Sequence, residues 1–179
     1  MNDSAPVAEG LAELRGAFDR SFAVARSSQG ADQTEDLLFV RVARDPYAIK
    51  VREISGIVSN SKTVAIPSRV SELLGVAAVR GSFLSVYSLA ALLGYGPAGD
   101  SVRLLVLCGP REPIALAVRD FEGYFRVSSR QIHAADQNEA ARGCVKQVVR
   151  TPDAVRAVVS IPDLIELIGT SSAVNKSKE

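Results

Sequence analysis

Three side chains in this sequence have the types that most often carry nucleophilic or acid–base chemistry: His133, Cys108 and Cys144. Ser-His-Asp and Cys-His couples need a histidine base, and His133 is the sole histidine of the chain. It stands between Ile132 and Ala134, outside any recognisable catalytic motif. We therefore expect no enzymatic activity, and we interpret His133 as a histidine of a surface loop or strand end.

The sequence also lacks the spacings of metal and phosphate sites. The two cysteines form no Cys-x-x-Cys pair and have no second histidine beside them, so we expect no metal centre and two reduced, buried thiols. The glycine-rich run Gly94–Gly99 does not end in the Lys-Ser/Thr of a phosphate loop, and we interpret it as a connector. No cofactor is expected.

Composition and charge exclude further classes of protein. Of the 179 residues, 47% are hydrophobic, and 21 basic side chains face 20 acidic ones for a net charge of +1. This neutral charge and the 6% aromatic content disfavour binding to nucleic acid. The longest apolar runs fall far short of the roughly 20 residues of a membrane helix, which predicts no direct membrane insertion. No leader pattern is visible at the N-terminus, so we expect a cytoplasmic protein.

Residues 1–35 are predicted to form an N-terminal helical extension and a linker. Between residues 6 and 26, large apolar side chains recur at helical spacing along one stripe, which predicts an amphipathic helix. This helix could pack on its own domain, enter the groove of a partner or remain disordered, and we consider it a possible docking helix. The stripe includes Leu11, Leu14, Phe18 and Phe22.

From Asp36 onward, short β-rich runs alternate with Gly, Pro and Asn at intervals of about ten residues, a pattern typical of small antiparallel sheets or barrels. Short helices are expected at residues 88–93 and 161–168, and a polar tail at 171–179. The expected strands are 37–43, 47–51, 63–66, 76–79, 83–87, 102–107, 113–118, 123–127, 145–150 and 155–159.

An internal repeat suggests that the β region is duplicated. Residues 46–57 align with residues 113–124 at a displacement of 67, with five identical pairs among twelve. A second match joins residues 86–89 to residues 158–161 at a displacement of 72. The repeat predicts two related β units in tandem, with a boundary near residues 94–100.

Ordered motifs across residues 36–170 resemble the CheW-like chemotaxis coupling (adaptor) family. Residues 50–54, Lys-Val-Arg-Glu-Ile, resemble the family's Val-x-Glu-Ile segment, and residues 75–81 resemble its Gly-Val-x-Asn-Leu-Arg-Gly signature. Arg130-Gln131-Ile132 is similar to a later Gln-Ile motif. The resemblance implies a mainly β fold of two small five-stranded SH3-like β barrels in tandem. Ala78, Ser85 and Ser88 depart from the family pattern, which indicates a diverged member.

The same resemblance implies a function. Proteins of this family are non-catalytic adaptors that couple the cytoplasmic tips of chemoreceptors (methyl-accepting chemotaxis proteins) to the regulatory domain of a CheA-type histidine kinase. We expect such a role here, in chemotaxis or surface motility, with recruitment to receptor arrays at the membrane. Two alternatives stay open: a diverged paralogue that serves as scaffold for another kinase pathway, and a small β-barrel ligand sensor or enzyme.

Four residues are the candidates for partner binding. By resemblance, Glu53 and Arg80 match a charge pair near the receptor- and kinase-facing surface. The alternative is a mainly structural ion pair whose loss would disturb binding indirectly. Arg80 could equally be a solvated arginine of a hairpin, because Gly81 follows it between two apolar strands. Val51 and Ile54 flank Glu53 and are candidates either for apolar contact with a partner or for core burial.

Overall fold

The structure is a computed structural model that describes residues 33–59, 62–96, 104–109, 113–135 and 143–176. The chain divides into two units, Met1–Gln33 and Thr34–Glu179. The predicted docking helix with Leu11, Leu14, Phe18 and Phe22 therefore lies outside the described residues, and the account below concerns the second unit.

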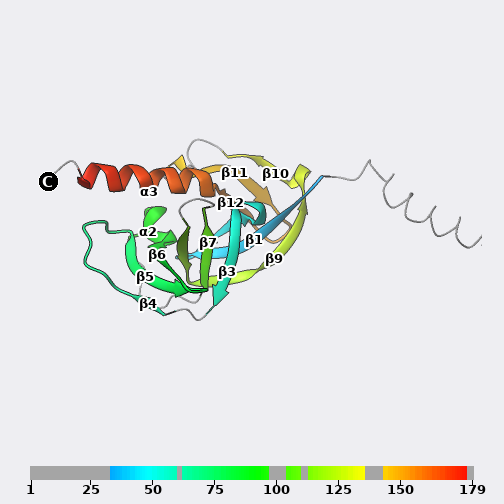
Figure 1. The fold of residues 1–179 in the computed structure, drawn as a ribbon. Coiled ribbons are helices and arrows are strands. Elements are labelled where there is room, and N and C mark those ends of the chain that lie inside the picture. The colour runs from blue at the N-terminus through cyan, green and yellow to red at the C-terminus, as the bar shows by residue number, and fades with distance from the viewer. Residues whose placement is uncertain (1–32, 60–61, 97–103, 110–112, 136–142, 177–179) are drawn as a thin grey trace, which may run out of the picture. The chain divides into compact units, whose positions relative to one another are not determined.

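Two six-stranded sheets make up most of this unit (Figure 1). The first sheet has the strand order β10-β11-β12-β2-β1-β9, and the second has the order β3-β7-β8-β6-β5-β4. Their bounds are β1 Thr34–Val42, β2 Asp45–Lys50, β3 Ile54–Ser59, β4 Thr63–Val64, β5 Leu73–Val79, β6 Ser82–Ser88, β7 Leu104–Cys108, β8 Ile114–Val118, β9 Asp120–Ser128, β10 Ile132–Ala134, β11 Val145–Arg150 and β12 Val155–Val159. The prediction of a mainly β protein with two β units is confirmed.

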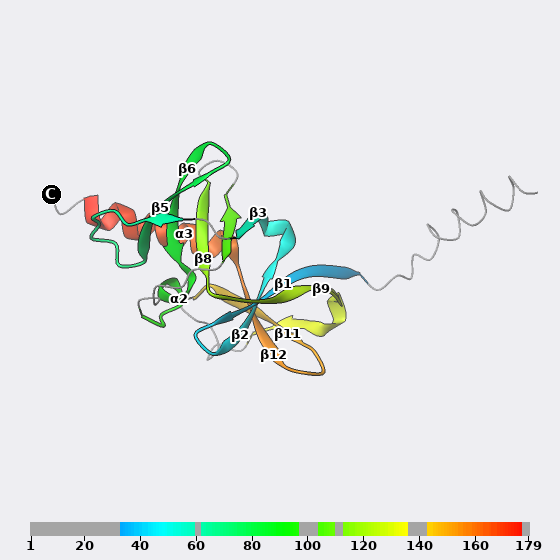
Figure 2. The same cartoon turned by 90° about the horizontal axis from the view of Figure 1, so that it is seen from below.

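The two sheets share the chain in an intertwined way. After β2 the chain leaves the first sheet through the short 3₁₀ helix η1 (Val51–Glu53) and builds the second sheet from β3 to β8. It returns at β9 and completes the first sheet with β10, β11 and β12. Figure 2 shows these two crossings between the sheets. The first sheet thus comes from both ends of the described chain. Both sheets have strands before and after residues 94–100, where the boundary between the two β units was expected.

The internal repeat has a direct structural counterpart. Residues 46–57 form β2, η1 and β3, while residues 113–124 form β8 and the first part of β9, so both copies are crossings between the sheets. Each copy also pairs with a parallel neighbour in the same way: Ala48 lies opposite Val158 of β12, and Ala115 lies opposite Val86 of β6. The repeat therefore marks two pseudo-equivalent halves of the fold.

Serine caps begin the two described α-helices. α2 (Leu89–Leu92) follows β6, and the Ser88 hydroxyl accepts a hydrogen bond from the Ala91 N–H at 3.1 Å. α3 (Ile161–Lys176) follows β12, and the Ser160 hydroxyl accepts one from the Asp163 N–H at 3.4 Å. These bonds satisfy backbone donors that a helix start leaves without partners. Ser88 and Ser160 are aligned with each other in the match between residues 86–89 and 158–161, so the chain starts a helix at the same point of each half.

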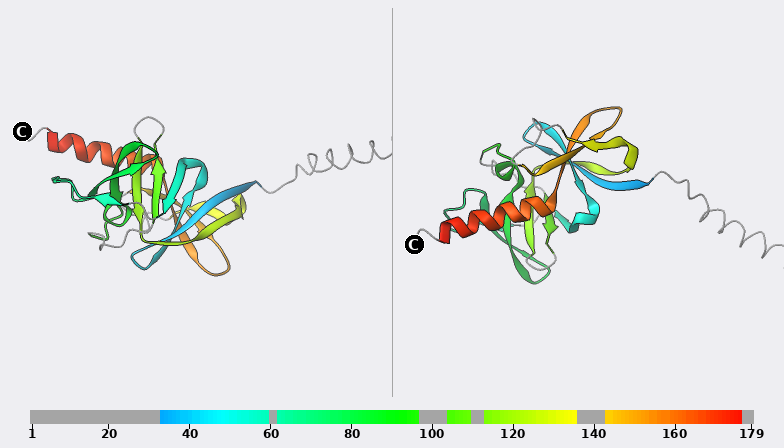
Figure 3. Two further views of the ribbon diagram at one scale, coloured as in Figure 1. Left: turned by 60° about the horizontal axis from the view of Figure 1, so that its bottom comes forward. Right: turned by 90° about the horizontal axis from the view of Figure 1, so that it is seen from above.

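α3 is longer than the sequence predicts. The expected helix ended at Ile168, yet the helix continues through Gly169 to Lys176 and includes the start of the expected polar tail. A single glycine inside a helix costs only about 1 kcal/mol relative to alanine, which is too little to end it. Figure 3 shows that α3 runs beside the second sheet.

Three clusters of buried side chains hold the unit together. The largest lies between the sheets and includes residues of both sheets, α2 and α3, for example Val40, Val106 and Leu164. A smaller cluster is formed by side chains of the second sheet, including Val86 and Ala115. Another is formed by side chains of the first sheet, including Phe39 and Val158. Six strands rather than five form each sheet, because β3 and β10 continue the sheets beyond the predicted strands.

Candidate partner-binding site

The turn η1 positions three of the four candidate residues, Val51, Glu53 and Ile54, and the hairpin between β5 and β6 positions Arg80. Val51 and Ile54 are half-buried and pack against the cluster between the sheets, so both retain some exposed surface. The chain turns here because the Ile54 N–H bonds to the Val51 carbonyl, which closes one 3₁₀ turn between β2 and β3. Half-burial is compatible with both of the interpretations made from the sequence.

Glu53 contacts the start of α3. Its Oε2 accepts a hydrogen bond from the Ile161 N–H at 3.0 Å, and its Oε1 lies 3.9 Å from the Lys50 Nζ. The side chain is only 17% exposed. A carboxylate at this position satisfies a free N–H of the helix and interacts favourably with the positive end of the helix dipole. Glu53 thereby links η1 to α3.

Arg80 lies at the tip of the hairpin between β5 and β6. Its φ of 49° and the φ of 82° at Gly81 form a tight turn with two left-handed residues, and Arg80 is exposed. One guanidinium nitrogen, Nη2, lies 4.0 Å from the point where a Cβ on Gly56 of β3 would stand. Arg80 therefore reaches across to β3.

The charge pair implied by the resemblance does not form between these side chains. Among the described residues, Glu53 pairs with Lys50 and Ile161, and no ion pair joins it to Arg80. The reason is the direction of each side chain: Glu53 turns toward the Ile161 N–H of α3, whereas Arg80 extends from its hairpin to Gly56 of β3. The alternative of a solvated hairpin arginine describes Arg80 better.

Exposed apolar side chains gather on the two strands that follow the crossings. β3 carries Ile57, which is 41% exposed, and β9 carries Phe121 and Tyr124, each 52% exposed. Among the described strands, β3 pairs only with β7 and β9 only with β1, so each strand stands at the edge of its sheet. We call these three residues the edge residues. Such apolar surface on a sheet edge is typical of interaction sites.

The edge residues were not identified as site residues from the sequence, although the repeat contained the signal. Ile57 and Tyr124 are the last aligned pair of the two repeat copies, and Phe121 aligns with Ile54. Apolar residues at equivalent positions of both crossings indicate a shared role. Phe83, at 81% the most exposed large apolar side chain of the described residues, follows the Arg80 hairpin and had no comparable signal.

Ion pairs and aromatic contacts fix β9 against the rest of its sheet. Glu122 accepts hydrogen bonds from the Arg41 Nη2 at 2.6 Å and from the Arg156 Nη2 at 3.0 Å. Burial acts to raise the pKa of Glu122, but these two hydrogen bonds outweigh it and hold the pKa below its ordinary value. The Arg156 guanidinium also covers the Phe39 ring at 4.3 Å, and Phe125 stacks on Phe39 at 4.4 Å.

The remaining titratable candidates have structural surroundings. Cys108 and Cys144 are buried thiols outside any disulfide, as predicted, and burial, helped by the charge of Glu53, raises the pKa of the Cys108 thiol to about 12. His133 lies exposed in β10. No group of three or more His, Cys, Asp or Glu side chains that could hold a metal ion occurs among the described residues. Within the same residues, no helix is long and apolar enough to cross a membrane.

Fold and exposed edges together define a class: an intertwined double-sheet β protein whose two crossings present apolar side chains at the sheet edges. The chain belongs to the CheW-like domain family, because the model of that family matches residues 36–171. Among solved structures, the chain is similar to the scaffolding protein TtCheW from Thermoanaerobacter tengcongensis, with 15% identity and a TM-score of 0.65. That match covers 72% of this chain and 90% of TtCheW. Comparison with the curated proteins found no match.

The family assignment supports a scaffold or coupling role in chemosensory signalling. The structural similarity independently supports the fold of two intertwined sheets.

Proposed function

We propose that this protein is a non-catalytic adaptor that couples chemoreceptor tips to the regulatory domain of a CheA-type histidine kinase in the cytoplasm. The observation that carries the proposal is the pair of exposed apolar sheet edges, one after each of the two crossings of a duplicated fold. An adaptor must hold two partners at once, and a fold with two equivalent edges offers two surfaces for doing so. Membership of the CheW-like family supports the identity of the partners.

In this proposal the edge residues Ile57, Phe121 and Tyr124 bind partners through apolar contacts. Burying three half-exposed side chains of this size contributes on the order of several kcal/mol before the costs of association are subtracted. Val51 and Ile54 extend the apolar surface toward η1, where both remain partly exposed.

Glu53 and Arg80 take different parts in partner binding. Arg80 is exposed and reaches β3 beside Gly56, so it can contact a partner seated on the β3 edge. Glu53 holds the start of α3 and positions η1, so its contribution to binding is indirect. The two residues therefore support the same surface without pairing with each other.

The proposal is tested by titrating the full chain with a chemoreceptor tip fragment and, separately, with a kinase regulatory domain. Ile57→Ser and Phe121→Ser should each weaken binding of at least one partner by about tenfold, because one buried apolar side chain contributes about 1.5 to 3 kcal/mol. Val155→Ser is the matched control, since Val155 is also 52% exposed but lies on β12, away from the sheet edges. Wild-type protein that is folded by circular dichroism and binds neither partner would contradict the proposal.

A further inference from the structure

A cavity of about 400 Å³ opens at the β10 end of the first sheet, and the edge residues take no part in it. We call it the β10 cavity. Its apolar lining comes from Ile132, Ala134, Val158 and Val159, and its polar lining comes from Lys50, Glu53, His133, Lys146, Gln147 and Ser160. A volume of this size falls within the range of ordinary ligand sites, and it can hold one apolar side chain together with one charged group.

Of the basic side chains in the cavity lining, Lys50 is the most buried. Its side chain is only 13% exposed, yet its ammonium group lies 3.9 Å from the Glu53 Oε1, which is too far for a hydrogen bond. None of the described residues accepts a hydrogen bond from it. The Lys50 side chain is largely buried, but its Nζ is not among the buried side-chain atoms of the described residues that lack a partner, so the ammonium group is reachable and can donate to an added anion.

Two neighbours offer further donors. Within the part of the chain that the structure describes, the side chains of His133 and Gln147 have no hydrogen bond. Lys146, by contrast, is engaged with Asp163 at 2.7 Å. Glu53 adds a negative charge to the cavity, but one of its oxygens is occupied by the Ile161 N–H. The free groups that line the cavity are therefore mainly donors.

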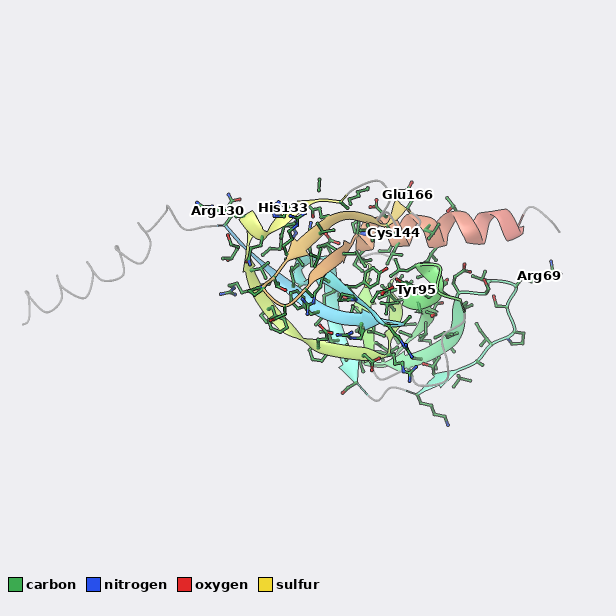
Figure 4. The ribbon with its side chains drawn as sticks, turned by 180° about the vertical axis from the view of Figure 1, so that it is seen from behind. Arg69, Tyr95, Arg130, His133, Cys144 and Glu166 are labelled. Atoms are coloured by element: carbon green, nitrogen blue, oxygen red, sulfur yellow. The ribbon has the colours of Figure 1, made fainter. Side chains whose placement is uncertain are left out.

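The surroundings of the cavity are cationic. Carboxylates of other elements pair with some of the basic side chains here: Asp36 with Arg126, Asp163 with Lys146 and Glu53 with Lys50. The described residues 126–135 and 143–150 contain no Asp or Glu of their own and also carry Arg130 and Arg150, so basic side chains remain in excess. Figure 4 shows Arg130 and His133 beside β10 at the same end of the sheet. Within the described part of the chain, β10 pairs only with β11, and its other edge has no described strand beside it and can take a partner strand. A cationic edge next to a donor-lined cavity is complementary to an acidic chain.

We propose that the β10 cavity binds an acidic segment of a partner protein. One carboxylate of the segment takes the ammonium group of Lys50, with His133 and Gln147 as further donors, and an adjacent apolar side chain lies on Ile132 and Val158. The segment runs along the cationic β10 edge. This inference deepens the proposed function, because it assigns a second contact surface, distinct from the edge residues, to one of the two partners.

The first test is independent of the identity of the partners. The ¹⁵N-labelled full chain is titrated by NMR with the peptide acetyl-Glu-Asp-Leu-Glu-Asp-amide to about 5 mM, a concentration at which weak single-site binding is visible. The expected result is a saturable shift of amides in β10, β11 and the end of β12 that disappears when Lys replaces each acidic residue of the peptide. Absent shifts, or shifts confined to other strands, would overturn the proposal.

Variants connect the cavity to Lys50. Lys50→Met keeps most of the side-chain volume and should weaken the peptide by about tenfold, while Lys50→Arg should restore part of the affinity. Lys62→Met is the matched control, because Lys62 is an exposed lysine beside the second sheet and its loss changes the net charge equally. Equal affinities of the Lys50→Met and Lys62→Met variants would show a general charge effect and would overturn the assignment.

The second test uses the partners of the proposed function. If wild-type protein binds the receptor tip and the kinase domain, Lys50→Met should weaken one of them and leave the other unchanged, with a salt dependence lost in the variant. Unchanged binding of both partners would reject the cavity while the proposed function stands. Failure of the wild type to bind either partner would reject the proposed function, and the peptide titration would still decide the inference about the cavity.

Discussion

The carboxylate of Glu53 accepts a hydrogen bond from the backbone N–H of Ile161 across 108 positions of sequence. This contact joins the turn that leaves the first sheet to the helix that follows its last strand. It explains why a glutamate is needed at the centre of a turn whose flanking residues, Val51 and Ile54, face the apolar cluster between the sheets.

Replacing Glu53 should therefore lower stability before it affects any partner. We expect Glu53→Ala to reduce the free energy of unfolding by about 1 to 2 kcal/mol, because the Ile161 N–H loses its acceptor. Glu53→Gln should lose less, since its amide oxygen can still accept the bond. Urea denaturation followed by circular dichroism measures both variants. Equal stability of Glu53→Ala and wild type would show that the contact contributes nothing.

Arg80 should behave in the opposite way. Arg80→Asn keeps a residue that tolerates the left-handed turn, and removes an exposed side chain that pairs with no described carboxylate. We expect a change in stability within about 0.5 kcal/mol, together with weaker binding of the partner on the β3 edge. Thermal unfolding and a binding titration of the same preparation separate the two effects. A large loss of stability would mean that Arg80 has a structural partner after all.

Acid should weaken the first sheet through Glu122. A carboxyl whose pKa in the folded state is below its unfolded value contributes stability above the unfolded pKa, and this contribution is lost as the pH falls through the folded-state pKa. The stability of wild type should fall below about pH 4. Glu122→Gln should be less stable at neutral pH by about 2 kcal/mol and should show a shallower loss in acid. Parallel pH profiles for the two proteins would contradict this role.

Two glycines with left-handed φ angles provide a matched pair. At Gly75 a Cβ would stand 2.0 Å from the Val64 carbonyl oxygen, whereas at Gly81 it would meet nothing within 4 Å. Gly75→Ala should therefore cost about 3 kcal/mol or more, because β4 must move away from β5. Gly81→Ala should cost only about 1 kcal/mol of backbone strain. Denaturant midpoints of the two variants test the difference, which similar values would refute.

The local features of the fold were predictable from the sequence, whereas the assignment of strands to sheets was not. Ser88 and Ser160 cap helices where the repeat places them, and most strands occupy the expected runs. The sequence did not predict that the two sheets share the chain. This sharing depends on the parallel pairing of β2 with β12, which lies more than a hundred residues later. Tyr47, Ala48 and Ile49 are all buried, so their apolar run fits a central strand in either arrangement.

The candidate site was predictable only in part, for a physical reason. Motif order located η1 and the Arg80 hairpin, but a motif does not give side-chain direction, and the supposed charge pair depends on direction. The left-handed turn at Arg80 and the helix start at Ile161 set the two side chains apart. The edge residues became recognisable once pairing showed that β3 and β9 each have a single neighbour among the described strands.

The central claim is that one molecule of this protein holds a receptor tip and a kinase regulatory domain at the same time. Sedimentation velocity of the full chain with each partner alone, and then with both, tests it most directly. We predict a ternary species that forms only when all three components are present and that Phe121→Ser or Ile57→Ser depletes. Folded wild-type protein that sediments separately from both partners in every mixture would contradict the account.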